Sequence, residues 1–219
     1  AWHWDIEQIK EKGFADNVAD LMAGKLRRLP QPVQETLQLA ACLGNKFVLY
    51  HLALIGGLAE GETWQHLLTA AHENLILIVD GHGKFLHDRI QQAAYALIPE
   101  ANRDAVHLHI GRTLLANLAA EEMSTQVFDV ANQFNRGAAL LTDPEEKAQV
   151  AMLNLRAGRR AKASAAFAAA SRYLAAGAAL FDEQDWTLRH ELLFELSLEH
   201  AEGDFLFGRF DAAEQGIDA

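Results

Sequence analysis

Residues 75–87, LILIVDGHGKFLH, decide the fold, because they carry the pattern of a β-hairpin. Leu75 to Val79 form a short run of apolar, mostly branched residues, which favours a strand. The segment Asp80-Gly81-His82-Gly83 has the composition of a turn, and residues 84–87 can return as a second strand. We therefore predict a β-hairpin in a chain whose other patterns are helical.

Three amphipathic helices are expected before this hairpin. The first covers residues 33–43, and Gly44 can end it in a left-handed conformation. Residues 47–56 are expected to form a short second helix and residues 61–75 a third. Three helices followed by a hairpin is the order of a winged-helix domain, in which the hairpin is the wing. A further helix is expected after the wing, with its apolar side chains inward: Ile90, Ala93, Ala94, Leu97 and Ile98.

From residue 101 onward every segment has a helical pattern. Residues 157–179 contain 12 alanines, and such small side chains let neighbouring helices approach closely, as stacked helix pairs do in solenoids. Ser124 and Asp143 are expected to be N-caps of two of these helices. The spacing of three residues matches part of the second helix of a tetratricopeptide repeat (TPR): Ala169, Tyr173 and Ala176.

The predicted fold class is therefore mainly α, with a winged-helix-like three-helix unit and a small β-hairpin, followed by TPR-like α-solenoid helices. We expect an N-terminal helical linker in residues 1–26, a winged-helix-like domain in residues 27–100 and a TPR-like helical repeat region in residues 101–219. The last repeat ends soon after its second helix begins, so the repeat region is expected to be truncated at the C-terminus.

Composition excludes several classes of protein. Hydrophobic residues make up 50% of the 219 residues and charged residues 22%, and no apolar run approaches the ~20 residues of a membrane helix. Cys42 is the single cysteine, so no intrachain disulfide can form and a cytoplasmic location is expected. The net charge of −11 opposes nucleic-acid binding, since phosphate contacts dominate that affinity.

No catalytic or metal-binding constellation is recognisable. Gly24-Lys25 resembles the end of a phosphate-binding loop, but Leu26 stands where that loop needs serine or threonine. His107 and His109 would point about 200° apart on a helix, so they cannot readily share a metal, and we expect the ten histidines to be scattered over the surface. Cys42 is expected to be a small core residue. A free-standing enzyme is supported only by the number of histidines.

The segment after the wing carries a resemblance to a known family. Phe85, His87, Ala93, Tyr95 and Ile98 match the pattern F-x-H-x-x-x-x-x-A-x-Y-x-x-I/L, which resembles an element near the winged helix of signal-transduction ATPases of the STAND class. Together with the stretches LQLAACLGNKF and VFDVANQFNRGAAL, nearly the whole chain is similar to bacterial multidomain proteins that join a serine/threonine kinase, a STAND/AAA-type ATPase and a sensor histidine kinase.

This resemblance implies a middle segment of such a protein, between the ATPase core and the sensor and histidine kinase domains. The chain lacks the phosphate loop and all kinase motifs, so it is expected to be a non-catalytic regulatory and protein-interaction segment that binds no cofactor itself. The resemblance implies ATP or ADP and magnesium for the full-length protein. The linker of residues 1–26 would then lead from the ATPase core.

Three residues are the candidates for nucleotide sensing. The resemblance suggests that His87 approaches the nucleotide phosphates, with Asp88 and Arg89 fixing its orientation or bridging to the ATPase core. In the alternative, His87 and Asp88 cap the helix while Phe85 and Tyr95 pack against the wing.

The expected partners are proteins. They are the other domains of the longer chain and a protein or peptide held on the concave face of the repeats. We expect neither nucleic acid nor a membrane as a partner, and the chain has the features of a possible homo-oligomer. The alternative function is a winged-helix DNA-binding transcription regulator with TPR-like repeats. The absence of lysine and arginine from residues 61–75 opposes this alternative.

Overall fold

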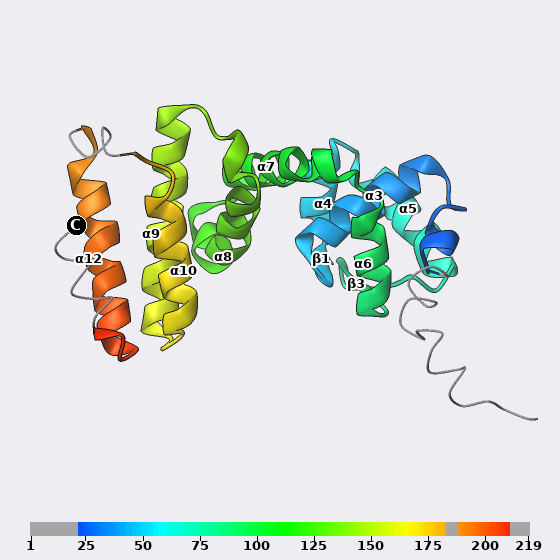
Figure 1. Cartoon of the computed structure of the whole chain (residues 1–219). Coiled ribbons are helices and arrows are strands. Elements are labelled where there is room, and N and C mark those ends of the chain that lie inside the picture. The colour runs from blue at the N-terminus through cyan, green and yellow to red at the C-terminus, as the bar shows by residue number, and fades with distance from the viewer. Residues whose placement is uncertain (1–21, 183–187, 211–219) are drawn as a thin grey trace, which may run out of the picture. The chain divides into compact units, whose positions relative to one another are not determined.

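The computed structural model describes residues 22–182 and 188–210, and most of the expected N-terminal linker lies outside them (Figure 1). The chain divides into two units, Ala1–Arg103 and Asp104–Ala219, each with its own packing. None of the described helices is long and apolar enough to cross a membrane. The two units are described separately below.

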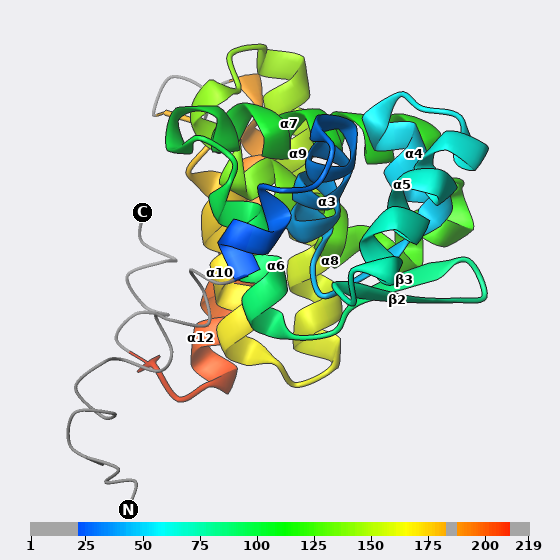
Figure 2. The ribbon, with the colours of Figure 1, turned by 90° about the vertical axis from the view of Figure 1, so that its right-hand side faces the viewer.

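The first unit contains four main helices and a three-stranded antiparallel sheet. The helices are α3 (Gln31–Leu43), α4 (Leu49–Gly56), α5 (Glu60–His72) and α6 (Asp88–Ala96). The strands are β1 (Lys46–Val48), β2 (Ile76–Val79) and β3 (His82–Phe85), in the order β1-β3-β2. The hairpin prediction is confirmed, and Figure 2 shows β2 and β3 extending beyond the helices beside them.

Strand β1 was not expected, because residues 47–56 had the pattern of one helix. Phe47 pairs with Gly83 of β3 and is buried beneath the sheet, so the helix α4 begins only at Leu49. A Cβ atom at position 83 would lie 2.2 Å from the Phe47 ring, so glycine is required there. Three residues are too few for the alternation of a strand to be visible in the sequence.

The turns of this unit depend on positive φ angles. Asp80 (φ 49°) and Gly81 (φ 75°) form a two-residue hairpin turn of the kind whose twist matches the strands. His82 and Gly83, expected in the turn, belong to β3. Gly44 does have a positive φ of 127°, but its ψ of −165° is extended, so the expected left-handed helix end is wrong.

The core of the first unit joins the helices to one face of the sheet. Helix α3 packs against both α5 and α6. Cys42 is buried, as predicted. The largest side chains that are fully buried in this unit come from every layer: Leu26, Leu37, Leu52, Leu67, Leu75, Phe85 and Ile90.

The second unit is entirely helical within its described residues. Its helices are α7 (Glu100–Asn117, which begins in the first unit), α8 (Ala120–Arg136), α9 (Pro144–Ala163), α10 (Phe167–Ala178) and α12 (His190–Leu206), with a short 3-10 helix, η1 (Ala138–Leu140). Helix α9 packs against α8, α10 and α12, and α10 packs against α12. The mainly α prediction is therefore confirmed (Figure 1).

One of the two predicted helix caps is correct. The Asp143 carboxylate accepts a hydrogen bond from the Glu146 amide at 3.0 Å and caps α9. Ser124 lies inside α8, where its hydroxyl donates to the Glu121 carbonyl at 2.9 Å. The helix begins earlier because the Glu122 carboxylate accepts from the Ala119 amide at 3.2 Å, which stabilises an end that has no polar cap residue.

Candidate functional site

The junction between β3 and α6 carries the three residues predicted to sense nucleotide. Phe85 anchors the end of β3, because it is fully buried and its ring meets the Phe47 ring edge-on at 5.8 Å. The Leu86 amide then donates to the Leu75 carbonyl at 3.1 Å and ties the exit of the strand to the entry of the hairpin. The chain therefore enters α6 from a fixed point.

His87 occupies the N-cap position of α6. Its backbone is extended (φ −144°, ψ 143°), and its carbonyl accepts from the Ile90 amide at 2.9 Å. The imidazole makes no capping hydrogen bond and is exposed. This arrangement places the imidazole ring at the positive end of a helix dipole. The backbone N–H groups at such a helix N-terminus can bind an anion.

Asp88 and Arg89 bond to different parts of the unit. The Asp88 Oδ1 atom accepts from Asn45 Nδ2 at 2.6 Å, which ties the start of α6 to the loop before β1. Arg89 Nη1 donates to Gln92 Oε1 at 3.1 Å on its own helix. Gln91 Nε2 reaches the Ala41 carbonyl at the end of α3, at 3.0 Å.

Asn45 is the residue of this site that the sequence did not reveal. It belongs to no motif, and its role depends on the contact with Asp88, 43 positions away. The adjacent Phe47 strand brings it there, and that strand was itself unexpected. Only its place after Gly44, a residue that often marks a helix end, could have drawn attention to it.

In the second unit, His107 is buried and corrects the expectation that the histidines lie on the surface. It is 1% exposed, and its Nδ1 donates to Gln133 Oε1 at 2.7 Å. Burial lowers the pKa of His107 below its ordinary value of 6.5, although the hydrogen bond to Gln133 opposes the shift. His51 in the first unit is also buried. The sequence pattern did not reveal the burial of these two histidines, because each occupies one position of a helix face that mixes polar and apolar residues.

A pair of amides joins α8 to α9. Asn135 and Asn154 exchange two hydrogen bonds of 2.8 Å, and Asn154 also donates to the Val150 carbonyl at 3.0 Å. Asn154 is fully buried. The pair therefore satisfies polar groups that would be costly to bury alone.

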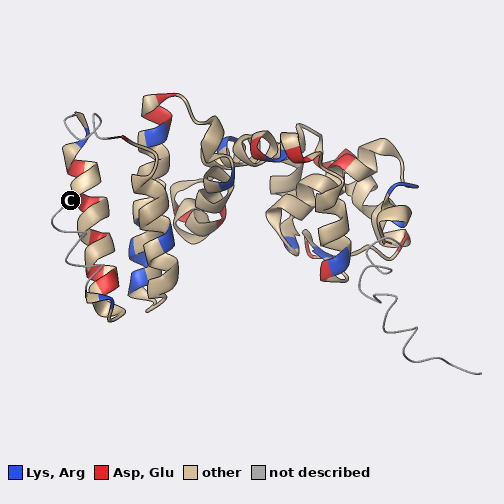
Figure 3. Cartoon of the chain, in the orientation of Figure 1, with Lys and Arg blue, Asp and Glu red and all other residues tan. Residues whose placement is uncertain are grey.

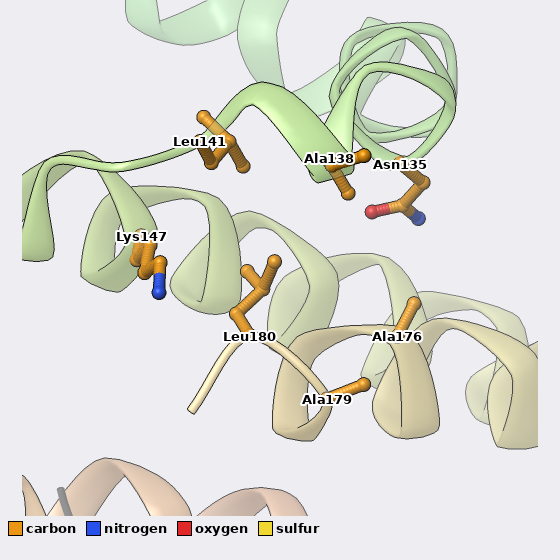
Figure 4. A pocket seen from close by; sticks show the side chains of 8 residues that line it. Asn135, Ala138, Leu141, Lys147, Ala176, Ala179 and Leu180 are labelled. Atoms are coloured by element: carbon orange, nitrogen blue, oxygen red, sulfur yellow. The ribbon is translucent and has the colours of Figure 1, made fainter. Parts of the chain in front are cut away.

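A hollow of about 500 Å³ opens beside this pair (Figure 4). Figure 4 shows Lys147 of α9 and Asn135 of α8 among small and aliphatic side chains from around η1 and the end of α10. Lys147 is the single charged residue of the lining, which consists of Asn135, Ala138, Ala139, Leu141, Lys147, Ala176, Ala179 and Leu180.

A second set of hollows follows the outer face of α9. Two of them, of about 480 and 460 Å³, share Met152, Arg189 and Leu192. They form a groove between Leu115, near the end of α7, and Leu188, just before α12. Met152 is 39% exposed in this groove, so its floor offers apolar surface to a ligand.

Ion pairs fasten α12 to α9. Arg159 bonds to Glu195 at 2.9 Å and to Glu199 at 2.6 Å, while Lys162 bonds to Glu199 and, at 2.7 Å, to Glu202. Burial disfavours the charge of Glu199, but hydrogen bonds from Lys162 and Arg159 outweigh it and lower the pKa of this carboxyl. The cluster therefore has a structural role between two helices.

No metal-binding group of three or more His, Cys, Asp or Glu side chains occurs within residues 22–182 and 188–210. The Gly24-Lys25 pair lies near the end of a helical turn, and the Lys25 Nζ donates to the Glu73 carbonyl. This lysine is thus occupied in holding α5.

Comparison with known proteins gives one relative. The chain is 25% identical, over 276 aligned positions, to hybrid signal transduction histidine kinase G of Dictyostelium discoideum. The similarity covers 98% of this chain but 8% of that protein. No protein-family model matches the chain, and no solved structure matches it significantly. The similarity supports a signalling-kinase context for both units.

Proposed function

We propose that this chain is a non-catalytic regulatory and protein-interaction segment of a STAND-type signal-transduction ATPase and kinase, and that it couples nucleotide state to kinase output. One observation carries the proposal: the similarity spans nearly the whole chain yet 8% of a hybrid histidine kinase. Both units therefore correspond to one segment of a much longer signalling protein.

The β3–α6 junction supports a role for His87 in sensing nucleotide. Its imidazole is exposed at a helix N-terminus, while the backbone around it is fixed by Phe85 and by the Asp88–Asn45 hydrogen bond. A fixed backbone with an exposed ring suits a group that must meet a phosphate supplied by another domain. ATP or ADP with magnesium would be held by that domain, and Asp88 and Arg89 would border the contact.

The second unit supports a role as a TPR-like scaffold. Helices α8, α9, α10 and α12 stack in sequence, and the groove along α9 offers Met152 and Leu192 beside charged rims. A protein or peptide ligand would bind in this groove through apolar side chains.

Nucleotide binding measured by calorimetry tests the proposal. We expect no binding of ATP by this chain alone, and binding by the full-length protein. In that protein, His87→Ala is expected to reduce the ratio between the affinities for the two nucleotides, ATP and ADP, by about five- to tenfold. This corresponds to roughly 1 kcal/mol of lost binding free energy. The matched control is His72→Ala. It removes another exposed imidazole, which lies at the C-terminal end of α5 and not at a helix N-terminus.

Two outcomes would contradict these statements separately. Binding of ATP by the chain alone would refute a segment that depends on an external nucleotide site. If the His87→Ala variant binds ATP with the wild-type affinity and ADP with the wild-type affinity, the sensor role is refuted. The assignment as a regulatory segment is not affected by that result.

A further inference from the structure

The hollow beside the Asn135–Asn154 pair is open because its walls carry small side chains. Four of its eight lining residues are alanines, which come from η1 and from the end of α10. Helix α10 contacts α9 closely at Gly177, where a Cβ atom would lie 3.0 Å from the Asn154 Cβ atom. Beyond this contact α10 ends at Ala178, and the alanines leave about 500 Å³ unfilled. Sites for small molecules are typically of this size.

The lining is apolar apart from Lys147 and Asn135. The Asn135 amide already exchanges two hydrogen bonds with Asn154. Lys147 precedes Asn154 by seven residues on α9, so the hollow extends about two helical turns, or roughly 10 Å, along this helix. Figure 4 shows Lys147 and Asn135 at opposite ends of the hollow, with Leu180 between them.

The charge of Lys147 is not neutralised by a neighbouring side chain. The start of α9 is acidic (Figure 3), but each of its three carboxylates has another partner. Asp143 accepts from the Glu146 amide, Glu145 pairs with Arg189, and Glu146 pairs with Arg112. Lys147 itself is half-buried, and within residues 22–182 and 188–210 its ammonium group forms neither an ion pair nor a hydrogen bond. An anionic group at this end of the hollow would supply the missing partner.

The chemistry of the lining favours a hydrocarbon chain over a peptide. A peptide would bring amide N–H and C=O groups into the hollow, and each buried group needs a hydrogen-bond partner. Asn135 is the one side-chain amide of the lining, and it is already bonded to Asn154. A hydrocarbon chain needs no such partners and is stabilised by leaving water.

We propose that the hollow binds a small amphipathic carboxylate of the fatty-acid class. Its carboxylate pairs with Lys147, and its chain extends along α9 toward Ala176 and the Asn135–Asn154 pair. A bound chain contacts residues around η1 and in both α9 and α10, so it stabilises the second unit. This inference is independent of the proposed nucleotide response and of the groove that contains Met152.

Calorimetry with octanoate as the probe tests the site on this chain. We expect saturable binding of one molecule per chain, with a dissociation constant of about 0.1–1 mM. Octanol has the same chain without the charge and is expected to bind about fivefold more weakly. Octylamine carries the opposite charge, and acetyl-leucyl-leucine adds amide groups to a carboxylate. Each of these two is expected to bind at least about fivefold more weakly than octanoate.

Two variants test the two ends of the hollow. Lys147→Met keeps an unbranched side chain without the charge, so octanoate affinity is expected to fall about fivefold while octanol affinity is unchanged. Ala176→Leu fills the apolar end, so both ligands are expected to lose about tenfold or more. The matched control is Ala175→Leu, which adds the same side chain at an exposed neighbouring position of α10 and is expected to change affinity by less than about twofold.

Circular dichroism of each variant establishes that it is folded, and Lys147→Met tests the charge even if Ala176→Leu does not fold. The proposal is overturned if the wild type shows no saturable octanoate binding or binds octylamine as tightly as octanoate. It is also overturned if octanoate binds Lys147→Met with the wild-type affinity. Tighter binding of acetyl-leucyl-leucine than of octanoate would assign the hollow to a peptide instead.

Discussion

His107 lies in an environment that disfavours the charged form of its imidazole. A buried imidazole is held neutral, since burial opposes its charge, and Gln133 supplies the hydrogen bond that it needs. Because its pKa in the folded protein is lowered, the unfolded chain binds more protons below pH 6.5. The contribution of this residue to stability is therefore complete above pH 6.5 and falls as the pH drops below that value.

The expected result is a pH-dependent difference between the wild type and His107→Asn. The asparagine amide can still donate to Gln133 but does not titrate, so the variant lacks the loss of unfolding free energy that the wild type shows as the pH falls below 6.5. Urea unfolding at a series of pH values measures the difference. Parallel pH profiles for the two proteins would show that His107 is not held neutral.

At the scale of elements, the contact between α9 and α10 depends on a missing side chain. A Cβ atom at Gly158 of α9 would lie 2.6 Å from Cγ of Leu174 on α10, closer than real contacts allow. The alanine-rich composition predicted close helix packing here, and Gly158 is one position where the two helices approach closely. The exact partner could not be predicted, because it depends on how the two helices cross.

Replacement of this glycine should separate the helices. Gly158→Ala is expected to destabilise the second unit by about 1–3 kcal/mol through overpacking. Gly203→Ala in α12 is the control, because a Cβ atom there has no neighbour within 4 Å, and a gain of about 0.5–1 kcal/mol is expected from helix propensity. Thermal unfolding of both variants measures the effect, and equal melting temperatures would contradict the packing argument.

The elements that the sequence predicted well are those with long or repeated signals. The hairpin was evident from residues 75–87, and the Asp143 cap followed from a local motif with Pro144. Strand β1 was missed because its pairing with β3 joins segments some 38 positions apart at Lys46 and Lys84. The Asn45–Asp88 contact of the candidate site depends on the same pairing, so it was missed for the same reason.

At the scale of the whole molecule, charge argues against nucleic acid as a partner. The net charge is −11, and α5, the counterpart of a recognition helix, carries Glu60 and Glu62 in its first turn and no lysine or arginine. The mainly α content follows from composition and periodicity. The surfaces that each unit exposes could not be predicted from the sequence, because burial depends on contacts between distant helices.

An electrophoretic mobility shift assay tests whether the chain binds DNA. We expect no shift of a duplex of about 30 base pairs at 50 mM salt with protein at roughly 10 μM, conditions under which nonspecific phosphate contacts are strong. A shift that disappears in the Lys46→Glu, Lys84→Glu variant would contradict this expectation and assign the wing to nucleic acid.

The Asn135–Asn154 pair limits how the second unit can respond to a ligand. Sliding α8 along α9 by one turn, about 5.4 Å, would break both mutual bonds and leave the buried Asn154 side-chain oxygen without its partner. The mutual hydrogen bonds therefore fix a single alignment of α8 along α9. A segment that binds beside them must adopt the spacing that the protein already has, so selection among ligands rests on their length and shape.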